Sequence, residues 1–197
     1  MNDHDRFGAA VAAEVLAASG ARREMLQSIV DVAAAIFLAE AASIAMLDGQ
    51  ELTFEAVAGR GAQDLLGARF GADQGIAGAV VMSGEPVIVD DLSRDPRFAR
   101  DVAEETGYAP SAIMVAPLLR DERTLGVLSV LDRGQTGRSS LQELELLVVF
   151  ADQAARAVDL TEAARRSQQL LEGDGEAGIE AVAVSYTHLT LPTTPYV

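Results

Sequence analysis

The sequence contains no cysteine and only two histidines. Without a thiol, the chain has no disulfide framework, no thiolate metal site and no cysteine nucleophile. The histidines, His4 and His188, lie near the two ends of the chain, outside its regularly patterned region. That region therefore offers no imidazole for a catalytic triad, a haem ligand or a metal cluster. The sequence predicts no catalytic residue and no metal site, and it leaves the identity of any cofactor open.

Positive charge is also scarce. The chain carries 15 Lys and Arg residues against 30 Asp and Glu residues, a formal net charge of −15 at pH 7. An acidic surface repels nucleic acid and anionic membranes, so neither is an expected partner. No apolar run reaches membrane-spanning length, and Asp3 and Asp5 stand where a signal peptide would have basic residues. We therefore expect a cytoplasmic protein.

Length and hydrophobicity suit one domain. Of the 197 residues, 49% are hydrophobic, which is enough for one good core and not for two. We expect the domain over residues 22–165, after a lead-in over residues 1–21 that is helical or disordered. Residues 166–184 would hold a helix end and a polar linker. Residues 185–197 resemble a translated adapter or vector sequence and are predicted to be a non-native tail, so a native downstream region would be missing.

Two helices are predicted before the first strand. An alanine-rich segment over residues 7–18 favours a helix that ends near Gly20. Apolar residues then recur at spacings of four, three and four, which predicts an amphipathic helix over residues 22–39. These residues are Met25, Ile29, Val32 and Ile36.

A hairpin should follow these helices. Two runs of alternating apolar and polar residues flank the dipeptide Asp48-Gly49, which is typical of a tight hairpin turn. In the second run, the alternation places Leu52, Phe54 and Ala56 on one face.

Glycine and proline are concentrated in the middle of the domain. The glycine-rich residues 59–74 are predicted to form a loop over a site. Gly84 can end a helix over residues 76–83 in the left-handed conformation, and residues 87–89 favour a short buried strand. So much glycine and proline around so little regular structure indicates the wall of a pocket.

The second half begins with a short helix predicted over residues 98–105. Two strongly apolar runs follow, residues 112–119 and 124–131, joined by the charged residues 120–123. This pattern predicts a second hairpin, and its apolar character places the hairpin centrally in a sheet.

The last helix carries the clearest indication of a partner. Ser140 and Glu143 have the spacing of a capping box and would start a helix over residues 140–171. Its apolar stripe is wider than one packing surface needs, which predicts a helix shared between the sheet and a parallel dimer seam. The alternative is a single helix that lies along the sheet. The predicted interface residues are Leu141, Leu144, Val148, Ala151, Ala155 and Val158.

A series of motifs lies between Gly75 and Phe98: G-x-x-G, GEP, V-x-V-x-D and D-P-R-F, in that order. Followed by a strand pair and a long helix, they resemble GAF domains, small-molecule-sensing and dimerising modules of bacterial signalling proteins and some phosphodiesterases. The resemblance covers residues 22–165. It implies a single α+β domain with an antiparallel sheet of about six strands, the terminal helices on one face and a ligand pocket under residues 59–110 on the other.

The pocket is expected beside the strand over residues 87–89. Large side chains that this order brings there could line a cavity, although Phe98 and Met114 could equally be plain core. Polar groups nearby would then contact the ligand. The predicted ligand-binding residues are Val89, Asp91, Arg97, Phe98, Tyr108, Met114 and Ser129.

Enzymatic alternatives have little support. Asp90 and Asp91 could form a divalent-metal or general-base site, but two carboxylates at a strand end are more often capping or solvated groups. Ser83 and Ser129 have no candidate base. Free-methionine sulfoxide reductases and bilin-binding phytochromes share the GAF fold but depend on cysteine, which this chain lacks.

The resemblance to cyclic-nucleotide-binding GAF domains is weaker. Their signature runs Asn-Lys-x-x-Phe-x-x-x-Asp-Glu. The nearest stretch here has Asp132 for the asparagine, Arg133 for the lysine and Ser139 roughly where the phenylalanine would be. These departures put cyclic GMP or AMP in doubt as ligands.

The leading hypothesis is a non-catalytic sensory module that converts occupancy of its pocket into a change in its helix pair. Its expected partners are a second copy of the chain, an unidentified small molecule and a downstream signalling effector. A dimerisation scaffold without a ligand is the first alternative, and an enzyme is the second.

Overall fold

The computed structural model describes residues 3–97, 108–135 and 137–161. The chain divides into two units, Met1–Asp159 and Leu160–Val197, and the fold below is that of the first. The helix predicted over residues 98–105 and the predicted tail lie outside the described residues.

The elements are α1 (Asp3–Ile36), β1 (Ala41–Asp48), β2 (Glu51–Gly59), α2 (Ala62–Leu65), β3 (Arg69–Gly71), α3 (Gly75–Ser83), β4 (Val87–Val89), the 3-10 helix η1 (Leu92–Arg94), β5 (Ile113–Arg120), β6 (Arg123–Leu131) and a final helix of which residues 140–161 are described.

The strands form one six-stranded antiparallel sheet in the order β3-β2-β1-β6-β5-β4. The two hairpins that the sequence predicts supply its four central strands, and β1 pairs with β6 to join them. The α+β class and the six-stranded sheet are thereby confirmed. No helix within the described residues combines the length and the apolar character needed to span a membrane.

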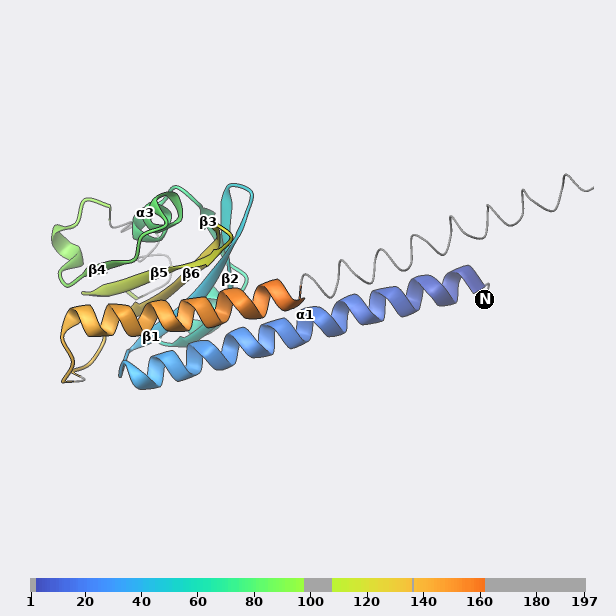
Figure 1. The fold of residues 1–197 in the computed structure, drawn as a ribbon, viewed down its shortest axis with the longest axis horizontal. Coiled ribbons are helices and arrows are strands. Elements are labelled where there is room, and N and C mark those ends of the chain that lie inside the picture. Colours follow the sequence, from blue (N-terminus) through green and yellow to red (C-terminus); the bar gives the residue numbers. More distant parts are fainter. Residues whose placement is uncertain (1–2, 98–107, 136, 162–197) are drawn as a thin grey trace, which may run out of the picture. The chain divides into compact units, whose positions relative to one another are not determined.

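The two faces of the sheet pack against different helices (Figure 1). On one face, Ile44, Met114 and Leu128 pack with α1 and the final helix in a single apolar cluster. On the other face, Val115 and Val127 pack with α3 and η1 in a second cluster. Both faces are apolar because successive side chains of a strand point to opposite sides and each side is covered.

Helix α1 is longer than the sequence predicts. The two separate segments expected on either side of Gly20 form one continuous helix from Asp3 to Ile36. A glycine inside a helix costs about 1 kcal/mol relative to alanine, and the alanine-rich flanks and the packing of Leu26 and Val30 outweigh that cost.

Residues 59–74 are more structured than the predicted loop. They contain the one-turn helix α2 and the strand β3, which pairs with β2 from Thr53 to Glu51. A strand of three residues is too short to show alternation, so periodicity could not reveal it.

The second hairpin has a two-residue turn instead of the predicted four-residue connection. Arg120 and Arg123 are cross-strand partners, and the turn residues Asp121 and Glu122 both have positive φ angles. Two successive residues in this conformation match the right-handed twist of the strands.

One predicted helix end is confirmed, and one predicted helix start is wrong by one residue. Gly84 ends α3 with a φ of 67°, as predicted, and its N–H donates to the Val80 carbonyl at 2.9 Å. The capping box of the final helix is formed by Ser139 and Gln142, not by Ser140 and Glu143. The Ser139 N–H donates to Gln142 Oε1 at 3.1 Å, and the Gln142 N–H donates to Ser139 Oγ at 3.4 Å.

Two glycine substitutions should have opposite effects on stability. A Cβ at Gly126 would lie 2.3 Å from the Ala45 carbonyl oxygen, so Gly126→Ala must displace β1 or β6. We expect it to lower the free energy of unfolding by about 1–3 kcal/mol. A Cβ at Gly20, in α1, meets nothing within 4 Å. Gly20→Ala should raise the same quantity by about 0.5–1 kcal/mol. Urea unfolding measures both, and equal effects would contradict the packing described.

Candidate functional site

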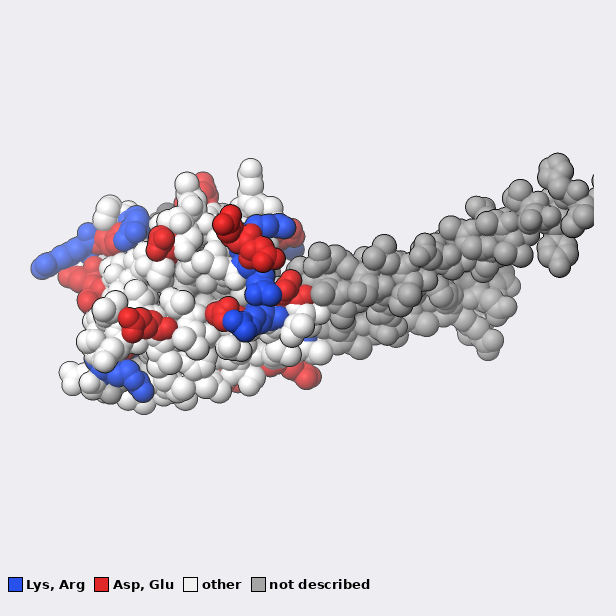
Figure 2. Space-filling model, in the orientation of Figure 1, with Lys and Arg blue, Asp and Glu red and all other residues white. Residues whose placement is uncertain are grey.

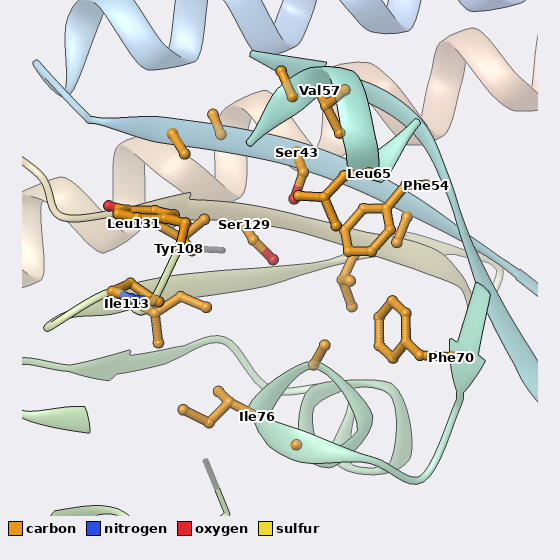
Figure 3. A pocket seen from close by; sticks show the side chains of 18 of the residues that line it. Ser43, Phe54, Val57, Leu65, Phe70, Ile76, Tyr108, Ile113, Ser129 and Leu131 are labelled. Carbon is orange, nitrogen blue, oxygen red and sulfur yellow. The ribbon is translucent and has the colours of Figure 1, made fainter. Parts of the chain in front are cut away.

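A cavity of about 150 Å³ lies on the α3 side of the sheet (Figure 3). Strands β1, β2, β5 and β6 form its floor, and the first turn of α3 covers it. Helix α2, β3 and the segment with Tyr108 and Pro110 form its sides. The cavity therefore lies on the face opposite the two long helices, where the sequence predicts a ligand pocket.

The walls of the cavity are mainly aromatic and aliphatic. The rings of Phe54 and Phe70 lie 5.2 Å apart between centroids, and Ile76 and Ile113 face the same space from α3 and β5 (Figure 3). Apolar walls of this kind, with a few polar groups among them, are typical of small-molecule sites.

A β-bulge sets the direction of Phe54. Ala45 pairs with Phe54 whereas Ile44 pairs with Ala56, so Glu55 is an extra residue in β2. Phe54 consequently faces the cavity, and Ala56 belongs to the core on the helix side. The expectation that both residues share a face is wrong, because the bulge reverses the alternation between them.

Two serine hydroxyls are the buried polar groups of the cavity. Ser43 on β1 and Ser129 on β6 are cross-strand partners, and they are only 6% and 8% exposed. Both hydroxyls face the cavity (Figure 3). Neither makes a side-chain hydrogen bond to any residue that the structure describes. No fully buried side-chain oxygen or nitrogen among the described residues lacks a hydrogen-bond partner, so these two hydroxyls are accessible from the cavity and available to a ligand.

A charged group stands at the rim. The exposed Arg60 donates to Glu40 at 2.8 Å, and its guanidinium lies 5.0 Å from the centre of the Tyr108 ring. The hydrogen bond and the charge of Glu40 raise the pKa of Arg60, so this side chain stays cationic. Arg60 and Tyr108 both line the cavity.

Tyr108 also connects the cavity to the end of β6. Its hydroxyl donates to Asp132, which accepts further hydrogen bonds from the Ser111 N–H at 2.8 Å, the Ser111 hydroxyl at 2.6 Å and the Ala112 N–H at 2.9 Å. Partial burial and the bond to Asp132 raise the pKa of the Tyr108 hydroxyl above its usual range. Burial alone would raise the pKa of Asp132, but the donors around it lower that pKa below its usual value.

The next residue, Arg133, connects β6 to the final helix. Arg133 Nε donates to Glu143 Oε2 at 2.6 Å, and its Nη2 donates to Asp90 Oδ1 at 2.7 Å. The side chains of Arg133 and Glu143 are only 12% and 5% exposed. Burial alone would lower the pKa of Arg133, but its two acidic partners raise it. One side chain thus holds together the end of β4, the end of β6 and the first turn of the final helix.

The structure brings only some of the predicted ligand residues to the cavity. Tyr108 and Ser129 line it. Val89 packs into the apolar cluster on that side of the sheet without lining the cavity. Met114 is fully buried on the opposite face among the helices, because the pleat of β5 presents its neighbours to the other side, where Ile113 lines the cavity and Val115 packs in the apolar cluster.

The other three predicted ligand residues have different positions. Asp91 caps η1 by accepting from the Ser93 N–H at 3.1 Å, and it pairs with Arg94. Arg97 is held by Asp95 through a hydrogen bond of 2.6 Å. Phe98 lies outside the described residues. Asp91 and Arg97 therefore stabilise local turns, and neither is among the lining residues that the structure describes.

Asp90 and Asp91 do not act together. Asp90 pairs with Arg133, whereas Asp91 caps η1. No cluster of three or more potential metal ligands occurs among the described residues.

Sequence reasoning missed Ser43, Phe54 and Phe70. Ser43 could have been found from its predicted position in a strand next to apolar neighbours, since a serine there must face either a partner or a cavity. Phe70 carried no usable signal, because β3 was not predicted.

The predicted interface residues fall into two groups. Ala151, Ala155 and Val158 are fully buried against the sheet in the domain's own core. Leu141 and Val148 are exposed, at 65% and 40%, and Leu144 is half-buried. The wide apolar stripe therefore comprises a face that packs inside the domain and a second face that is accessible.

The sheet, the helix pair on one face and the partly open cavity on the other define an α+β domain with a small-molecule-sized pocket. The model of the GAF domain family matches residues 21–158. The chain belongs to the GAF domain family, as its motifs between Gly75 and Phe98 predict.

Known proteins that resemble the chain include an enzyme and a regulator. It is 31% identical over 103 residues to the probable 3',5'-cyclic phosphodiesterase pde-5 of Caenorhabditis elegans, covering 51% of this chain and 14% of that protein. It is 28% identical over 131 residues to the Nif-specific regulatory protein of Herbaspirillum seropedicae, covering 64% of this chain and 24% of that protein. Each match spans less than a quarter of the relative.

Solved structures agree in fold. The GAF domain from a phosphoenolpyruvate-protein phosphotransferase of Coxiella burnetii superposes with a TM-score of 0.65, covering 78% of this chain and 94% of that one. Sequence identity is 19%, so the likeness is one of architecture.

The hydrogen bonds to Asp132 predict how stability depends on pH. Its pKa in the folded chain lies below that of an unfolded aspartate, about 3.9. The stabilisation by the carboxylate is therefore complete above about pH 4 and is lost as the pH falls through the folded-state pKa. Asp132→Asn should destabilise the protein most at neutral pH, and its difference from the unmodified protein should shrink in acid. Urea unfolding between pH 7 and pH 3 measures this difference. Asp64→Asn, which removes an exposed carboxylate, is the control, and a difference for Asp132→Asn that grows in acid would contradict the assignment.

Proposed function

We propose that this GAF domain is a non-catalytic sensory module that binds a small molecule in the cavity between the sheet and α3. The observation that carries the proposal is a partly open apolar cavity lined by two serines, Ser43 and Ser129, whose hydroxyls make no side-chain hydrogen bond to any described residue. No fully buried side-chain oxygen or nitrogen among the described residues lacks a partner, so these two hydroxyls are accessible from the cavity. A molecule that enters the cavity can therefore hydrogen-bond to them.

The chemistry of the lining supports binding over catalysis. A serine nucleophile needs a base within hydrogen-bonding reach. The described lining residues include no carboxylate, and two carboxylates next to lining residues, Asp132 and Glu40, are held by Tyr108 and Arg60. The chain would then act within a longer cytoplasmic signalling protein and control an effector, which accords with its similarity to a Nif-specific regulatory protein.

A route from the cavity to the helices runs through Tyr108, Asp132, Arg133 and Glu143. The ring of Tyr108 lines the cavity, and its hydroxyl binds Asp132. Arg133 follows in the chain and is bound to Glu143 in the first turn of the final helix. A ligand that moves the Tyr108 ring would therefore change the position of the end of β6 and of the helix attached to it. Such a displacement would be the signal.

Filling the cavity tests ligand binding. Ala77 lines the cavity from α3, and leucine there would occupy the space without opposing helix formation. A metabolite library screened by thermal denaturation should contain a molecule that stabilises the unmodified protein. At about 100 times its Kd, the shift should be about 5–10 °C. Ala77→Leu should remove this shift.

Ala79→Leu is the matched control for that experiment. Ala79 is in the same helix but is not among the residues that line the cavity, so its variant should keep the shift. If no molecule stabilises the unmodified protein, and native mass spectrometry finds no small molecule released on denaturation, the proposed sensory function is wrong. The dimerisation scaffold would then be the better interpretation.

We further propose that two copies associate through the exposed sides of the helices. Large apolar side chains are exposed on both α1 and the final helix, and a wide uncharged area separates the charged groups in Figure 2. Contiguous exposed apolar surface is uncommon on a monomer and marks interaction sites. Among the side chains that the structure describes, the exposed large apolar residues of the two helices within the first unit are Met25, Val32, Ile36, Leu141, Val148 and Val149.

Charge placed on these helices should separate the copies. The double variant Val32→Glu/Val148→Glu changes one exposed position on each helix and leaves the core intact, so it should be folded and monomeric. The single variant Arg23→Glu makes the same change in net charge at an exposed position of α1, and it should remain dimeric because residues two apart on a helix, such as Arg23 and Met25, do not share a face. Light scattering at tens of micromolar gives the mass. A monomeric unmodified protein, or a dimeric Val32→Glu/Val148→Glu variant, would refute the interface.

A further inference from the structure

We infer that the ligand is an electrically neutral molecule about the size of one six-membered ring, with a hydrogen-bonding group that reaches Ser43 and Ser129. This inference rests on the proposed sensory function and specifies the class of molecule sensed. Three properties of the cavity carry it: the placement of its two hydroxyls, the position of its charged group, and its volume.

The hydroxyls define where the polar end of the ligand lies. Ser43 and Ser129 stand opposite each other on the two central strands, so both can contact one atom or one small group. A hydroxyl can donate and accept, so the pair suits a phenol, an alcohol or a carbonyl group. The remaining floor and walls, including Phe54, Phe70 and Ile113, are apolar and suit a hydrocarbon ring.

The charges around the cavity exclude an ionised ligand. Arg60 is the one charged residue among the described lining residues, and it is exposed at the rim. Its charge is balanced by Glu40 at 2.8 Å, and its guanidinium lies over the Tyr108 ring. An anion or a cation at the serine pair would lose its hydration without gaining a counter-charge.

The volume limits the size of the molecule. In an unrelated protein, an engineered cavity of about 150 Å³ lined by Leu, Ile and Phe accommodates benzene. The present cavity has about the same volume, 150 Å³. A monocyclic molecule therefore fills this volume without any rearrangement of the sheet or α3, whereas a nucleotide, which carries a base, a sugar and a phosphate, would extend out of the cavity through its open side.

Two pairs of probes separate these properties. Phenol and toluene have similar size, but only phenol can hydrogen-bond to the serines. Benzamide and benzoate have similar shape, but only benzoate is charged. Each would be titrated into the ¹⁵N-labelled protein, with amide chemical shifts giving the Kd and the location of binding. The variants would be Ser43→Ala/Ser129→Ala and, as a matched control, Ser28→Ala at an exposed site on α1. Circular dichroism verifies that both variants are folded.

The expected result is binding of phenol and benzamide with shifts at residues of β1, β6 and α3. Removing both hydroxyls should weaken phenol binding about 2- to 12-fold, the effect of one lost neutral hydrogen bond, and should not weaken toluene binding. Benzoate should bind at least about 10-fold more weakly than benzamide, because a buried charge without a partner is strongly disfavoured. Ser28→Ala should change none of these values.

Two failures are distinguishable. If benzoate binds as well as benzamide, or if the serine variant binds phenol unchanged, the inferred ligand class is wrong while the pocket remains a binding site. If none of the four probes shifts residues of the cavity and the library screen also finds no ligand, the proposed sensory function fails together with the inference. If the library yields an ionised or much larger ligand, sensing stands and the inference is overturned.

Discussion

The architecture depends on two central strands that are buried on both faces. Within β1 and β6, alternate residues must satisfy two different apolar environments, one made by the long helices and one made by α3 and the cavity. A shift of one residue in the pairing of these strands would exchange the two sets of side chains. Ser43 and Ser129 would then face the helices, and Ile44 and Leu128 would occupy the cavity floor. Correct register is therefore required for the core and for the pocket together.

The same register explains why a polar pair can persist in an apolar sheet. Ser43 and Ser129 face the cavity, and no fully buried side-chain oxygen or nitrogen among the described residues lacks a hydrogen-bond partner, so their hydroxyls are accessible from the cavity. The fold therefore does not bear the cost of about 1–3 kcal/mol that an unsatisfied buried hydroxyl carries. Ala45, Val115 and Val127 pack with Ile76 and Val80 on the same side of the sheet.

The end of β6 is where pocket and helices meet. Asp132 and Arg133 directly follow β6, and Asp132 has a positive φ of 46°. Asp132 accepts hydrogen bonds from Tyr108, Ser111 and Ala112. Arg133 donates hydrogen bonds to Asp90 and Glu143. Because Glu143 is nearly buried, its charge requires Arg133, and the first turn of the final helix cannot move independently of β6. Two adjacent residues thereby couple regions that are distant in sequence.

Local chemistry determined the elements of this protein from the sequence alone. Asp48-Gly49 specifies a tight turn, Gly84 ends α3 in the left-handed conformation, and the apolar runs on either side of residues 120–123 specify central strands, because each depends only on neighbouring residues. The ordered motifs between Gly75 and Phe98 were sufficient to identify the family. Tertiary structure alone decided which side of the sheet each residue faces. The bulge at Glu55 sends Phe54 and Ala56 to opposite faces, the pleat of β5 buries Met114 among the helices, and the antiparallel pairing of β1 with β6 brings Ser43 to Ser129 across 85 intervening residues. Such relationships arise from strand register and long-range packing, which periodicity along one segment does not encode.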